Sequence, residues 1–494
     1  MRNIKKTGLI LGILLIFTLT VNSQNTFELL VENDYDKLIL DVVELPDGSF
    51  VLCGTYLDSN QTGKFKGYLI KINEEGAITD SVYLNEYAYC TLHNIHFYNN
   101  ELYVIAALQE NADTNFTLGL FRLNTDLEIL DVKTNALHGS NKHIGFLNSI
   151  IDSDENLVMG GIINDYDDND EYLGLEGFLY KISMSGDSLN SVFFNEYLHK
   201  IPYGIIENID STGYHVFIKR YSNNSVCSKM LLNKGLEEVS VVNLTSEIFA
   251  LFDALHSATH ASPVRLSDGS IMLSGRYNTN ETHFAFTVTD DNSIMATAFI
   301  ENDNRIQWAN TYGNSVNGNH IYSGYTSNVS LTNFFYSQDT SHIHVLKFDE
   351  QLNTIWHKAI GGDAYYNLYR VLACNDGGCL LVGNRFDYAS GQGNIRDVYI
   401  AKLNQDGEFA WQKTFSISNA ISIYPNPATH TINFSLPENI SISRYSVFNL
   451  QGELLLSRKA ESNSVTIDVL APGAYIIQLT TNMGIVSKRF LKME

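Results

Sequence analysis

An acidic run near the middle of the chain contains the residues best suited to hold a cation. It reads Asn164-Asp-Tyr-Asp-Asp-Asn-Asp-Glu171, so carboxylate and amide oxygens follow one another closely. Hard cations such as Ca2+ take several oxygen ligands from one flexible loop. Asp165, Asp167 and Asn169 match the first, third and fifth positions of a calcium-binding loop, and Glu176 matches the last. The spacing therefore predicts a Ca2+ site at these four residues.

One position of this run departs from the calcium-loop pattern. Such a loop needs glycine at its sixth position for a sharp turn, and the chain has Asp170 there. The alternative interpretation is a solvated loop that joins two strands of a sheet.

Pairs of histidines are the other candidates for metal ligands. His256 and His260 stand four residues apart in the most helix-like run of the body, 249–260, and on a helix they would share one face. The alternative is a short helix with surface histidines. His93 and His96 are three apart, so on a strand they would point to opposite sides. His342 and His344 could share a strand face, but the sequence supplies no evident third ligand.

Local motifs for catalysis or cofactor binding are missing from the sequence. It has no Gly-x-Ser-x-Gly nucleophile elbow, no phosphate-binding Gly-Lys-Ser/Thr loop and no dinucleotide-binding glycine motif. We therefore assign no catalytic or cofactor-binding residue. A pair of carboxylates for glycoside hydrolysis cannot be picked from 55 acidic residues by sequence alone.

The amino-terminal residues 1–23 predict a secretory signal peptide. Arg2, Lys5 and Lys6 precede an apolar run over 9–19, and the small residues near Ser23 suit cleavage before Gln24. The run is short of the ~20 residues that a membrane-spanning helix needs, and we expect no transmembrane segment. Removing the signal peptide takes three positive charges from a net charge of −23. So acidic a surface repels nucleic acid and anionic membranes and could attract divalent cations.

The five cysteines are too few for a disulfide framework in a chain of 494 residues. Cys374 and Cys379 flank the turn Asn375-Asp-Gly-Gly378, which would place them on two neighbouring strands. One interpretation is a disulfide across this turn, and the other is two small buried apolar side chains.

A unit of about 55 residues recurs along the middle of the chain. Its markers are Asp-Gly turns, as in Leu45-Pro-Asp-Gly48 and Leu266-Ser-Asp-Gly269, each followed by an apolar strand that ends in glycine. Short runs of Val, Ile, Leu, Tyr and Phe between such turns are typical of antiparallel hairpins. Seven units of four strands predict an all-β fold, a seven-bladed β-propeller over residues 24–417. An eight-bladed ring and an open repeat array are the alternatives.

The strand pattern at the two ends of the body favours a closed ring. Residues 27–31 occupy the place of a fourth strand before the first full unit, and residues 409–414 form the fourth strand of the last unit. Seven blades do not need both, so we expect one of them to pair across the ring junction. The last unit also resembles repeats common in secreted bacterial propeller-like proteins, a resemblance that implies the fold and no activity.

Residues 418–494 have a second set of sequence motifs, different from those of the repeat. It opens with Tyr424-Pro-Asn-Pro427, continues through a strand ending near Gly452, and has the turn Leu470-Ala-Pro-Gly473 before a strand that bears Tyr475. Its last strand is basic. Within these motifs we single out Pro425, Asn426 and Pro472, and on the basic strand Lys488, Arg489 and Lys492. Alternating apolar residues predict a small immunoglobulin-like β-sandwich.

This segment resembles the type A C-terminal sorting domain of the type IX secretion system, which is found in Bacteroidota. The resemblance implies export through the periplasm and across the outer membrane, with the translocon and a cysteine-protease-like sortase as partners. The protein would then be released or attached to the cell surface.

The function that these observations favour is a non-catalytic surface or secreted propeller that binds a glycan, a protein or another extracellular ligand. The rival hypothesis is a secreted hydrolase or lyase that acts on polysaccharide or peptide from a site at the channel mouth. A third is a structural or adhesive component of the cell surface.

Overall fold

The computed structural model consists of strands and their connections, with no helix among the residues it describes. The described residues are 25–32, 35–58, 64–111, 115–137, 143–166, 172–194, 200–220, 226–244, 257–259, 263–277, 282–300, 307–308, 313–328, 336–391, 394–408, 412–416, 421–436, 440–449, 454–460, 462–481 and 484–493. The predicted signal peptide lies outside them.

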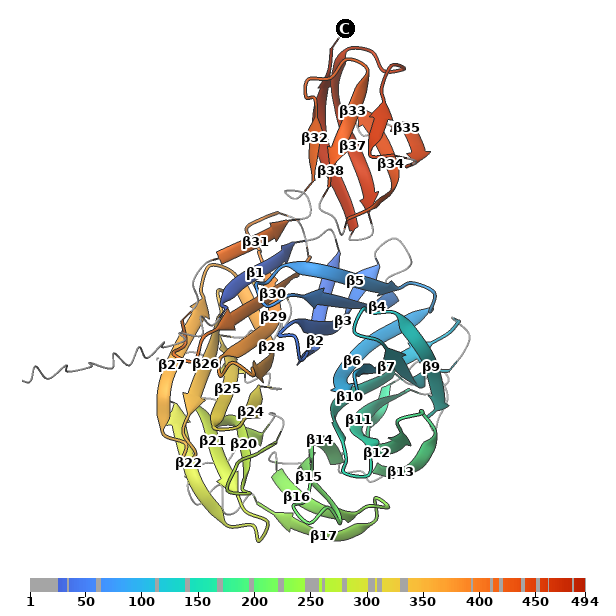
Figure 1. The fold of residues 1–494 in the computed structure, drawn as a ribbon. Helices are drawn as coiled ribbons and strands as arrows, with labels where there is room; N and C mark the ends of the chain where they lie inside the picture. Colours follow the sequence, from blue (N-terminus) through green and yellow to red (C-terminus); the bar gives the residue numbers. More distant parts are fainter. Residues whose placement is uncertain are drawn as a thin grey trace, which may run out of the picture.

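Within those residues, seven sheets stand around a ring and confirm the predicted propeller (Figure 1). Blade 1 contains β2 (Asp36–Glu44), β3 (Phe50–Asp58), β4 (Lys64–Ile72) and β5 (Ile78–Leu84). Blade 2 contains β6 (Tyr89–Tyr98), β7 (Glu101–Gln109), β8 (Thr117–Leu123) and β9 (Ile129–Ala136). Blade 3 contains β10 (His143–Ile151), β11 (Asn156–Tyr166), β12 (Tyr172–Ser183) and β13 (Ser188–Phe194). Blade 4 contains β14 (Lys200–Glu207), β15 (Gly213–Arg220), β16 (Val226–Asn233) and β17 (Glu238–Asn243).

The remaining three blades depart slightly from this plan. Blade 5 has two short inner strands, β18 (Ser257–Thr259) and β19 (Val264–Arg265), before β20 (Ile271–Tyr277), β21 (Thr282–Val288) and β22 (Ile294–Ile300). Blade 6 likewise has β23 (Gln307–Trp308) and β24 (Asn314–Asn317) before β25 (His320–Ser327), β26 (His342–Phe348) and β27 (Thr354–Gly361). Blade 7 contains β28 (Tyr365–Ala373), β29 (Cys379–Phe386), β30 (Asp397–Leu403), β1 (Phe27–Glu32) and β31 (Gln412–Ser416).

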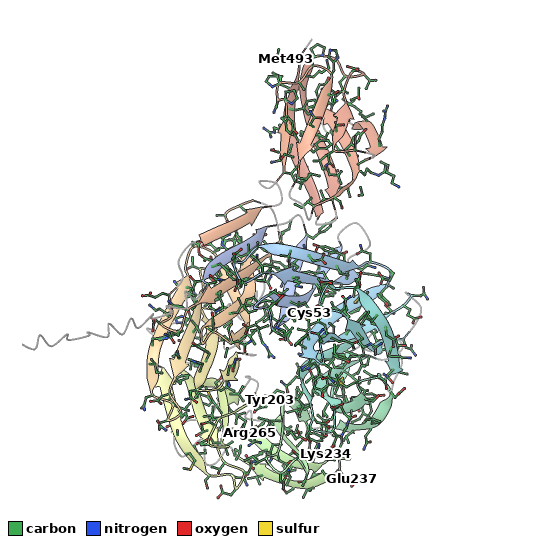
Figure 2. All side chains as sticks on the ribbon, viewed as in Figure 1. Cys53, Tyr203, Lys234, Glu237, Arg265 and Met493 are labelled. Atoms are coloured by element: carbon green, nitrogen blue, oxygen red, sulfur yellow. The ribbon has the colours of Figure 1, made fainter. Side chains whose placement is uncertain are left out.

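Each blade buries both of its faces against its neighbours. On β3, for example, Cys53, which Figure 2 labels, packs in an apolar cluster with blade 2. Leu52 packs in the cluster shared with blade 7. Successive strand residues point to opposite faces, so one strand serves two interfaces. Burial of apolar surface at these interfaces stabilises the ring by roughly 25 cal/mol for each Å² removed from water.

A glycine inside the second strand of several blades is required by a close backbone approach, although the sequence pattern placed it at the strand's end. A Cβ atom on Gly54 would lie 2.0 Å from the carbonyl oxygen of Leu38 on the inner strand, and one on Gly383 would lie 2.2 Å from that of Asn367. Both glycines lie beside a β-bulge of the inner strand, where the pairing register shifts. Only glycine leaves room for the carbonyl there.

A lysine on the third strand of several blades links that blade to the next. The Lys71 ammonium donates to the carbonyl oxygen of Thr125 at 2.8 Å, and Lys347 donates to that of Gln405 at 2.9 Å. Lys229 donates to the carbonyl oxygens of Thr289 and Asp290. Each acceptor lies in the turn before the outermost strand of the following blade, so the repeated lysine satisfies turn carbonyls while its stem covers apolar surface.

Strand β1 closes the ring between the first and last parts of the chain. It pairs antiparallel with β30, from Phe27 opposite Lys402 to Val31 opposite Val398. On its other side it pairs in parallel with β31, from Glu28 opposite Gln412 to Glu32 opposite Ser416. Of the two candidates for the clasp, the amino-terminal strand therefore takes the fourth place of blade 7, and β31 adds a fifth strand outside it.

The carboxy-terminal residues form two sheets that fit an immunoglobulin-like sandwich. One sheet has the order β32 (Ser422–Tyr424), β33 (Thr431–Ser435) and β36 (Ser464–Thr466). The other has the order β35 (Leu454–Lys459), β34 (Ile442–Asn449), β37 (Gly473–Thr481) and β38 (Gly484–Lys492). Ile432, Val447 and Ile477 are buried in its core.

Candidate functional site

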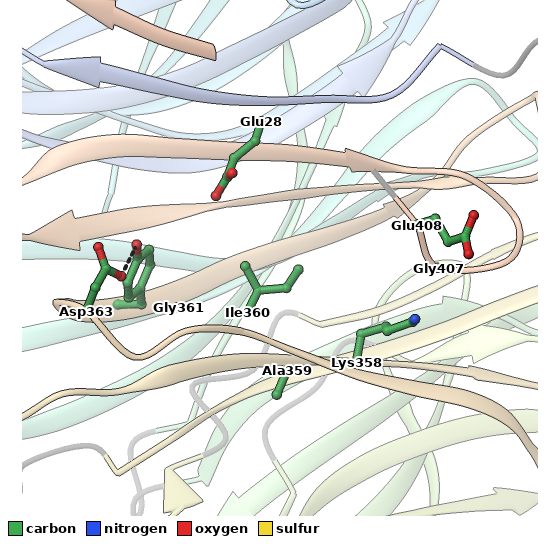
Figure 3. Close-up of a pocket in the computed structure, with 9 residues that line it drawn as sticks. Glu28, Lys358, Ala359, Ile360, Gly361, Asp363, Gly407 and Glu408 are labelled. Atoms are coloured by element: carbon green, nitrogen blue, oxygen red, sulfur yellow. Dashed lines mark hydrogen bonds between the residues drawn. The ribbon is translucent and has the colours of Figure 1, made fainter. Parts of the chain in front are cut away.

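A pocket of about 710 Å³ lies where the outer strand of blade 6 meets blade 7 (Figure 3). It is lined by Glu28, Lys358, Ala359, Ile360, Gly361, Asp363, Tyr366, Gly407 and Glu408. Its walls thus come from β1, β27, the start of β28 and the turn that follows β30. The volume is in the range of pockets that hold small ligands or short segments of larger ones.

Glu28 is the most deeply placed carboxylate of the pocket. It is only 9% exposed, and Figure 3 shows its carboxylate pointing from β1 into the space above Ile360. The Tyr399 hydroxyl donates a hydrogen bond to its Oε1 at 2.7 Å. Burial, together with the negative charge of Glu28, raises the pKa of Tyr399 far above its ordinary value, so the hydroxyl stays a donor. The pocket therefore contains a buried carboxylate in a fixed orientation.

Asp363 forms the second acidic wall of the pocket and belongs to a hydrogen-bonded group. Its Oδ1 accepts from the Tyr366 hydroxyl at 2.9 Å, and its Oδ2 lies 3.0 Å from Nη2 of Arg385. Arg385 also donates through Nε to the Tyr366 hydroxyl, at 3.2 Å. Burial raises the pKa of Asp363, but the hydrogen bonds from Tyr366 and Arg385 and the Arg385 charge outweigh it, and the net pKa is below its ordinary value. Asp363 is thus held ionised.

The third acidic side chain, Glu408, is placed by a turn that blade 6 holds in position. The Asn404 side-chain oxygen accepts from the Glu408 amide at 2.9 Å. The carbonyl oxygen of Gln405, in the same turn, accepts from the Trp356 indole at 2.9 Å as well as from Lys347. Glu408 and Lys358 both line this pocket. With three carboxylates and one ammonium, the lining has a net charge of −2.

Sequence reasoning missed this pocket. Its lining residues come from positions 28, 358–366 and 407–408, and no local motif connects them. The only sequence signal was the surplus strand at the two ends of the body, which indicated that blade 7 is assembled from both.

The predicted Ca2+ ligands lie mostly outside the described side chains. Asp167 and Asn169 lie outside the described residues, between β11 and β12. Asp165 lies on β11 opposite Gly174, and Glu176 lies on β12 opposite Ile163, so the run joins two paired strands of blade 3. Within the described part of the chain, no group of three or more His, Cys, Asp or Glu side chains is arranged to hold a metal ion. The Ca2+ site stays a prediction.

The predicted helix over 249–260 is wrong at its carboxy-terminal end. Ser257–Thr259 form strand β18 and pair with β20, because the inner edge of blade 5 supplies hydrogen-bond partners that outweigh local helix propensity. His256 and His260 themselves lie outside the described residues.

The other predicted histidines lie within the described residues. His93, His96 and His344 each have a different hydrogen-bond partner. His93 contacts the Thr91 hydroxyl at 2.9 Å and His96 contacts that of Ser149 at 2.7 Å. His344 is hydrogen-bonded to His357, 2.9 Å from Nδ1 to Nε2, and it stacks on Tyr325 with ring centroids 4.5 Å apart. His357, on the neighbouring strand, was not recognised from the sequence.

Cys374 and Cys379 are both buried and free. Cys374 packs in the cluster shared with blade 1, and Cys379 packs in the cluster shared with blade 6. The two thiols thus belong to opposite faces of blade 7, and the structure has two buried small side chains in place of a disulfide. Burial raises the pKa of Cys379 to about 12.

The motif residues of the carboxy-terminal domain bring its first segment onto its last strand. The Asn426 side chain donates to the carbonyl oxygen of Arg489 at 3.1 Å and accepts from the amide of Leu491 at 3.0 Å. Tyr475 stacks on Phe490 with ring centroids 5.5 Å apart, and its hydroxyl donates to the carbonyl oxygen of Ala471 at 2.7 Å. The Pro-Asn-Pro opening and the basic end therefore form one surface. Of the predicted motif residues, Gly452 lies outside the described part.

A family model, described as the secretion system C-terminal sorting domain, matches residues 422–493. These residues are a type IX secretion sorting domain. The sorting domain confirms that the protein is exported across the outer membrane to the cell surface or the medium, and it implies contact with the secretion machinery. It covers the last part of the chain and leaves the activity of the propeller open. Met493, at its far end, is 48% exposed (Figure 2).

No curated protein matches the chain in sequence. Among solved structures, the β-propeller domain of the trilobed protease of Pyrococcus furiosus is similar at 10% identity and a TM-score of 0.41, covering 76% of this chain and 98% of that one. PorZ, a surface component of the type IX secretion system of Porphyromonas gingivalis, is similar at 9% identity and a TM-score of 0.29, covering 92% and 81%. A protein of unknown function from Bacteroides caccae is similar at 10% identity and a TM-score of 0.36, covering 59% and 90%.

Among the described residues, no helix is long and apolar enough to cross a membrane.

Proposed function

We propose that this protein is a non-catalytic binding protein of the cell surface or medium, which holds an extracellular ligand in the pocket between blades 6 and 7. The observation that carries the proposal is the state of the pocket's polar groups. Asp363 is fixed by Tyr366 and Arg385 and is kept ionised by them. A general acid needs the opposite, a carboxyl whose pKa is raised towards the working pH.

The tyrosines of the pocket support the same conclusion. Burial, with the negative charge of Asp363, raises the pKa of Tyr366 well above its ordinary value, and Tyr399 behaves in the same way beside Glu28. Both hydroxyls therefore remain neutral hydrogen-bonding groups at physiological pH. Fixed charges and neutral donors suit recognition of a ligand, because they lose little entropy when it binds.

The two sides of the ring differ in a way that also supports binding. The turns between first and second strands, and between third and fourth, are short and repeat along the chain. The other connections vary widely: residues 328–341 join β25 to β26, and residues 387–396 join β29 to β30. Variable connections on a repeated scaffold are where binding proteins place specificity.

The experiment compares binding with turnover on the same preparation. The secreted protein would be screened against a glycan array and a peptide array, and incubated with a panel of polysaccharides and peptides. We expect a ligand that binds without being cleaved and whose affinity falls in the Glu28→Gln variant. Gln keeps the oxygen that accepts from Tyr399, so loss of binding reports loss of the charge.

The competing function is hydrolysis of a polysaccharide, and three carboxylates around one pocket are the observation that favours it. Catalytic turnover of any substrate, abolished by Glu28→Gln or Glu408→Gln, would overturn the binding proposal in favour of this one.

Processing by the secretion pathway completes the proposal. After translocation, a sortase removes the sorting domain, and the propeller is released or attached to surface lipopolysaccharide. Mass spectrometry of the mature protein tests this step: the proposal requires a carboxy terminus before residue 422, and a mature chain that retains residues 422–493 contradicts it.

A further inference from the structure

Among the described residues, no strand pairs with the outer edge of β27 in blade 6, and this edge borders the pocket. In the described residues, β27 is the last strand of its sheet, in the order β23, β25, β26, β27. Four consecutive residues of it, 358–361, line the pocket. Side chains alternate between the two faces of a strand, so a pocket that contacts four residues in a row runs along the strand's edge. That edge presents backbone N–H and C=O groups to whatever occupies the pocket.

Blade 6 has a β-bulge at the start of β27, and the part of the strand that lines the pocket lies beyond it. The pairing register between β26 and β27 shifts at Ile355, which is a bulge residue and 57% exposed. The bulge lies at the start of β27, whereas the pocket begins three residues later. From Trp356 to Gly361 the strand pairs with β26 without interruption, so a further strand could pair along the same length.

Blade 7 shows how this molecule extends such an edge. There, β1 occupies the fourth place of the blade, which β27 occupies in blade 6, and β31 pairs in parallel with its outer side. The opposite wall of the groove beside β27 comes from β1 through Glu28 and from the turn that bears Glu408. A segment lying against β27 would therefore take the position in blade 6 that β31 takes in blade 7.

The negative charge of the pocket favours positively charged side chains on such a segment. Glu28, Asp363 and Glu408 face it against a single ammonium, that of Lys358. Glu28 is the strongest element of this selection, because a carboxylate that is nine-tenths buried gains more from a cation than an exposed one does.

We propose that the pocket binds an extended peptide segment rich in lysine or arginine, which adds to blade 6 as a strand along the edge of β27. This inference rests on the proposed binding function and names its ligand class. Backbone hydrogen bonds to β27 provide affinity, and alternate side chains of the peptide reach Glu28 and Glu408. A glycan has no backbone amides at strand spacing, so the free edge favours a peptide.

The probe is a short fluorescent peptide in which lysine alternates with threonine, and the measurement is fluorescence anisotropy with the full secreted protein. A second peptide has glutamate in place of lysine. A third and a fourth keep the lysines but carry N-methyl groups on alternate amides, in one register or the other. We expect the lysine peptide to bind, the glutamate peptide to fail, and one N-methylated register to lose at least about tenfold in affinity.

Matched variants locate the peptide on the protein. Glu28→Gln should weaken binding at least about tenfold, because a buried charge is lost, and Glu408→Gln about fivefold. Lys358→Glu should strengthen it, a result that unfolding cannot produce. Glu128→Gln is the control: it occupies the same turn position in blade 2, where Asn124 accepts from its amide as Asn404 accepts from that of Glu408.

The possible results separate the ligand class from the function. Equal binding of both N-methylated registers and the parent peptide would overturn strand addition, and equal binding of the glutamate peptide would overturn the selection for basic residues. A glycan ligand whose affinity falls in Glu28→Gln would overturn the peptide while leaving the binding function in place. Turnover of a substrate would overturn both.

Discussion

Arg396 holds the carboxylate of Asp36 with two of its nitrogens, Nε at 2.7 Å and Nη2 at 2.6 Å, across the junction of the last and first blades. Both side chains are buried, and the Tyr336 hydroxyl donates to the same carboxylate at 2.6 Å. The Arg396 amide also donates to Asp36, at 3.0 Å. Residues 360 positions apart thus fix one corner of the ring.

Removing one member of this pair should destabilise the ring strongly. Asp36→Ala leaves a buried guanidinium without its partner, which costs about 3–5 kcal/mol of the free energy of unfolding. All three tryptophans, Trp308, Trp356 and Trp411, precede the sorting domain, so their fluorescence during urea unfolding reports the ring. Asp126→Ala, on an exposed turn, should change stability by less than about 0.5 kcal/mol. A loss in Asp36→Ala as small as in this control would refute the role of the pair.

Strand β1 should be as important as any internal strand, although it lies at the amino-terminal end. Leu29 is 1% exposed and pairs with Ile400 on one side and Lys413 on the other. Leu29→Ala should cost about 2–5 kcal/mol through the cavity it leaves. Leu29→Pro should cost more, because proline also removes the amide donor. If the two variants unfold at the same urea concentration, pairing of β1 contributes nothing beyond packing.

Buried histidines should make the ring less stable in acid. Burial, aided by His357, lowers the pKa of His344 to about 3, and burial lowers that of His283 to about 3. In the unfolded chain a histidine titrates near about 6.5, so between the two values the unfolded state binds more protons. The stabilisation is present above about 6.5 and is lost as the pH falls towards 3.

A variant isolates this effect. His344→Gln should reduce the slope of stability against pH in that window by up to about 1.4 kcal/mol per pH unit, the amount due to one proton. Urea unfolding at a series of pH values measures the slope. His430→Gln is the control: it lies in the sorting domain, outside the ring whose unfolding the tryptophans report, so the slope for the ring should stay the same. An unaltered slope in His344→Gln would mean that this histidine is already protonated in the folded ring.

Deleting residues 421–494 should leave the propeller in the periplasm. The sorting domain is the export signal. The contact of Asn426 with the last strand lies wholly within the deleted segment, so the deletion does not break it on one side only. Fractionation of cells that express the truncated and full-length chains measures the distribution. Delivery of the truncated chain to the surface at the full-length level would show that the propeller carries a second export signal.

Ca2+ should raise the melting temperature of the propeller if the acidic run between β11 and β12 binds it. Asp165 and Glu176 are brought onto paired strands, and Asp167 and Asn169 lie between them in sequence. The double change Asp165→Ala/Asp167→Ala should abolish the rise, while Asp126→Ala should keep it. A melting temperature of the unmodified protein that is the same with Ca2+ and with a chelator would eliminate the site.

The fold was predictable because short local motifs mark each repeat in the sequence. Asp-Gly turns and the glycines at positions such as 54 and 383 recur because several blades need the same turn and the same close approach. The third-strand lysines were not singled out from the sequence, because their role depends on carbonyls of the next blade, as in the contact of Lys71 with Thr125. Such contacts follow only from the stacking of blades.

The candidate site was not predictable for the same reason. Glu28 is separated from Asp363 and Glu408 by most of the chain, and the three meet only because β1 enters blade 7. The disulfide considered at Cys374 and Cys379 fails on a related point: turn spacing alone does not indicate that the two thiols belong to opposite faces.

The place of β1 has a consequence for the order of events in the cell. The first strand of the ring to be synthesised pairs with residues near 400, which belong to the last blade. Loop closure over so long a chain is slow, so for most of its biosynthesis the protein is a string of blades with one exposed, apolar and unpaired strand at its leading end. The ring therefore cannot close until the last blade has been made, so this topology places closure at the end of biosynthesis.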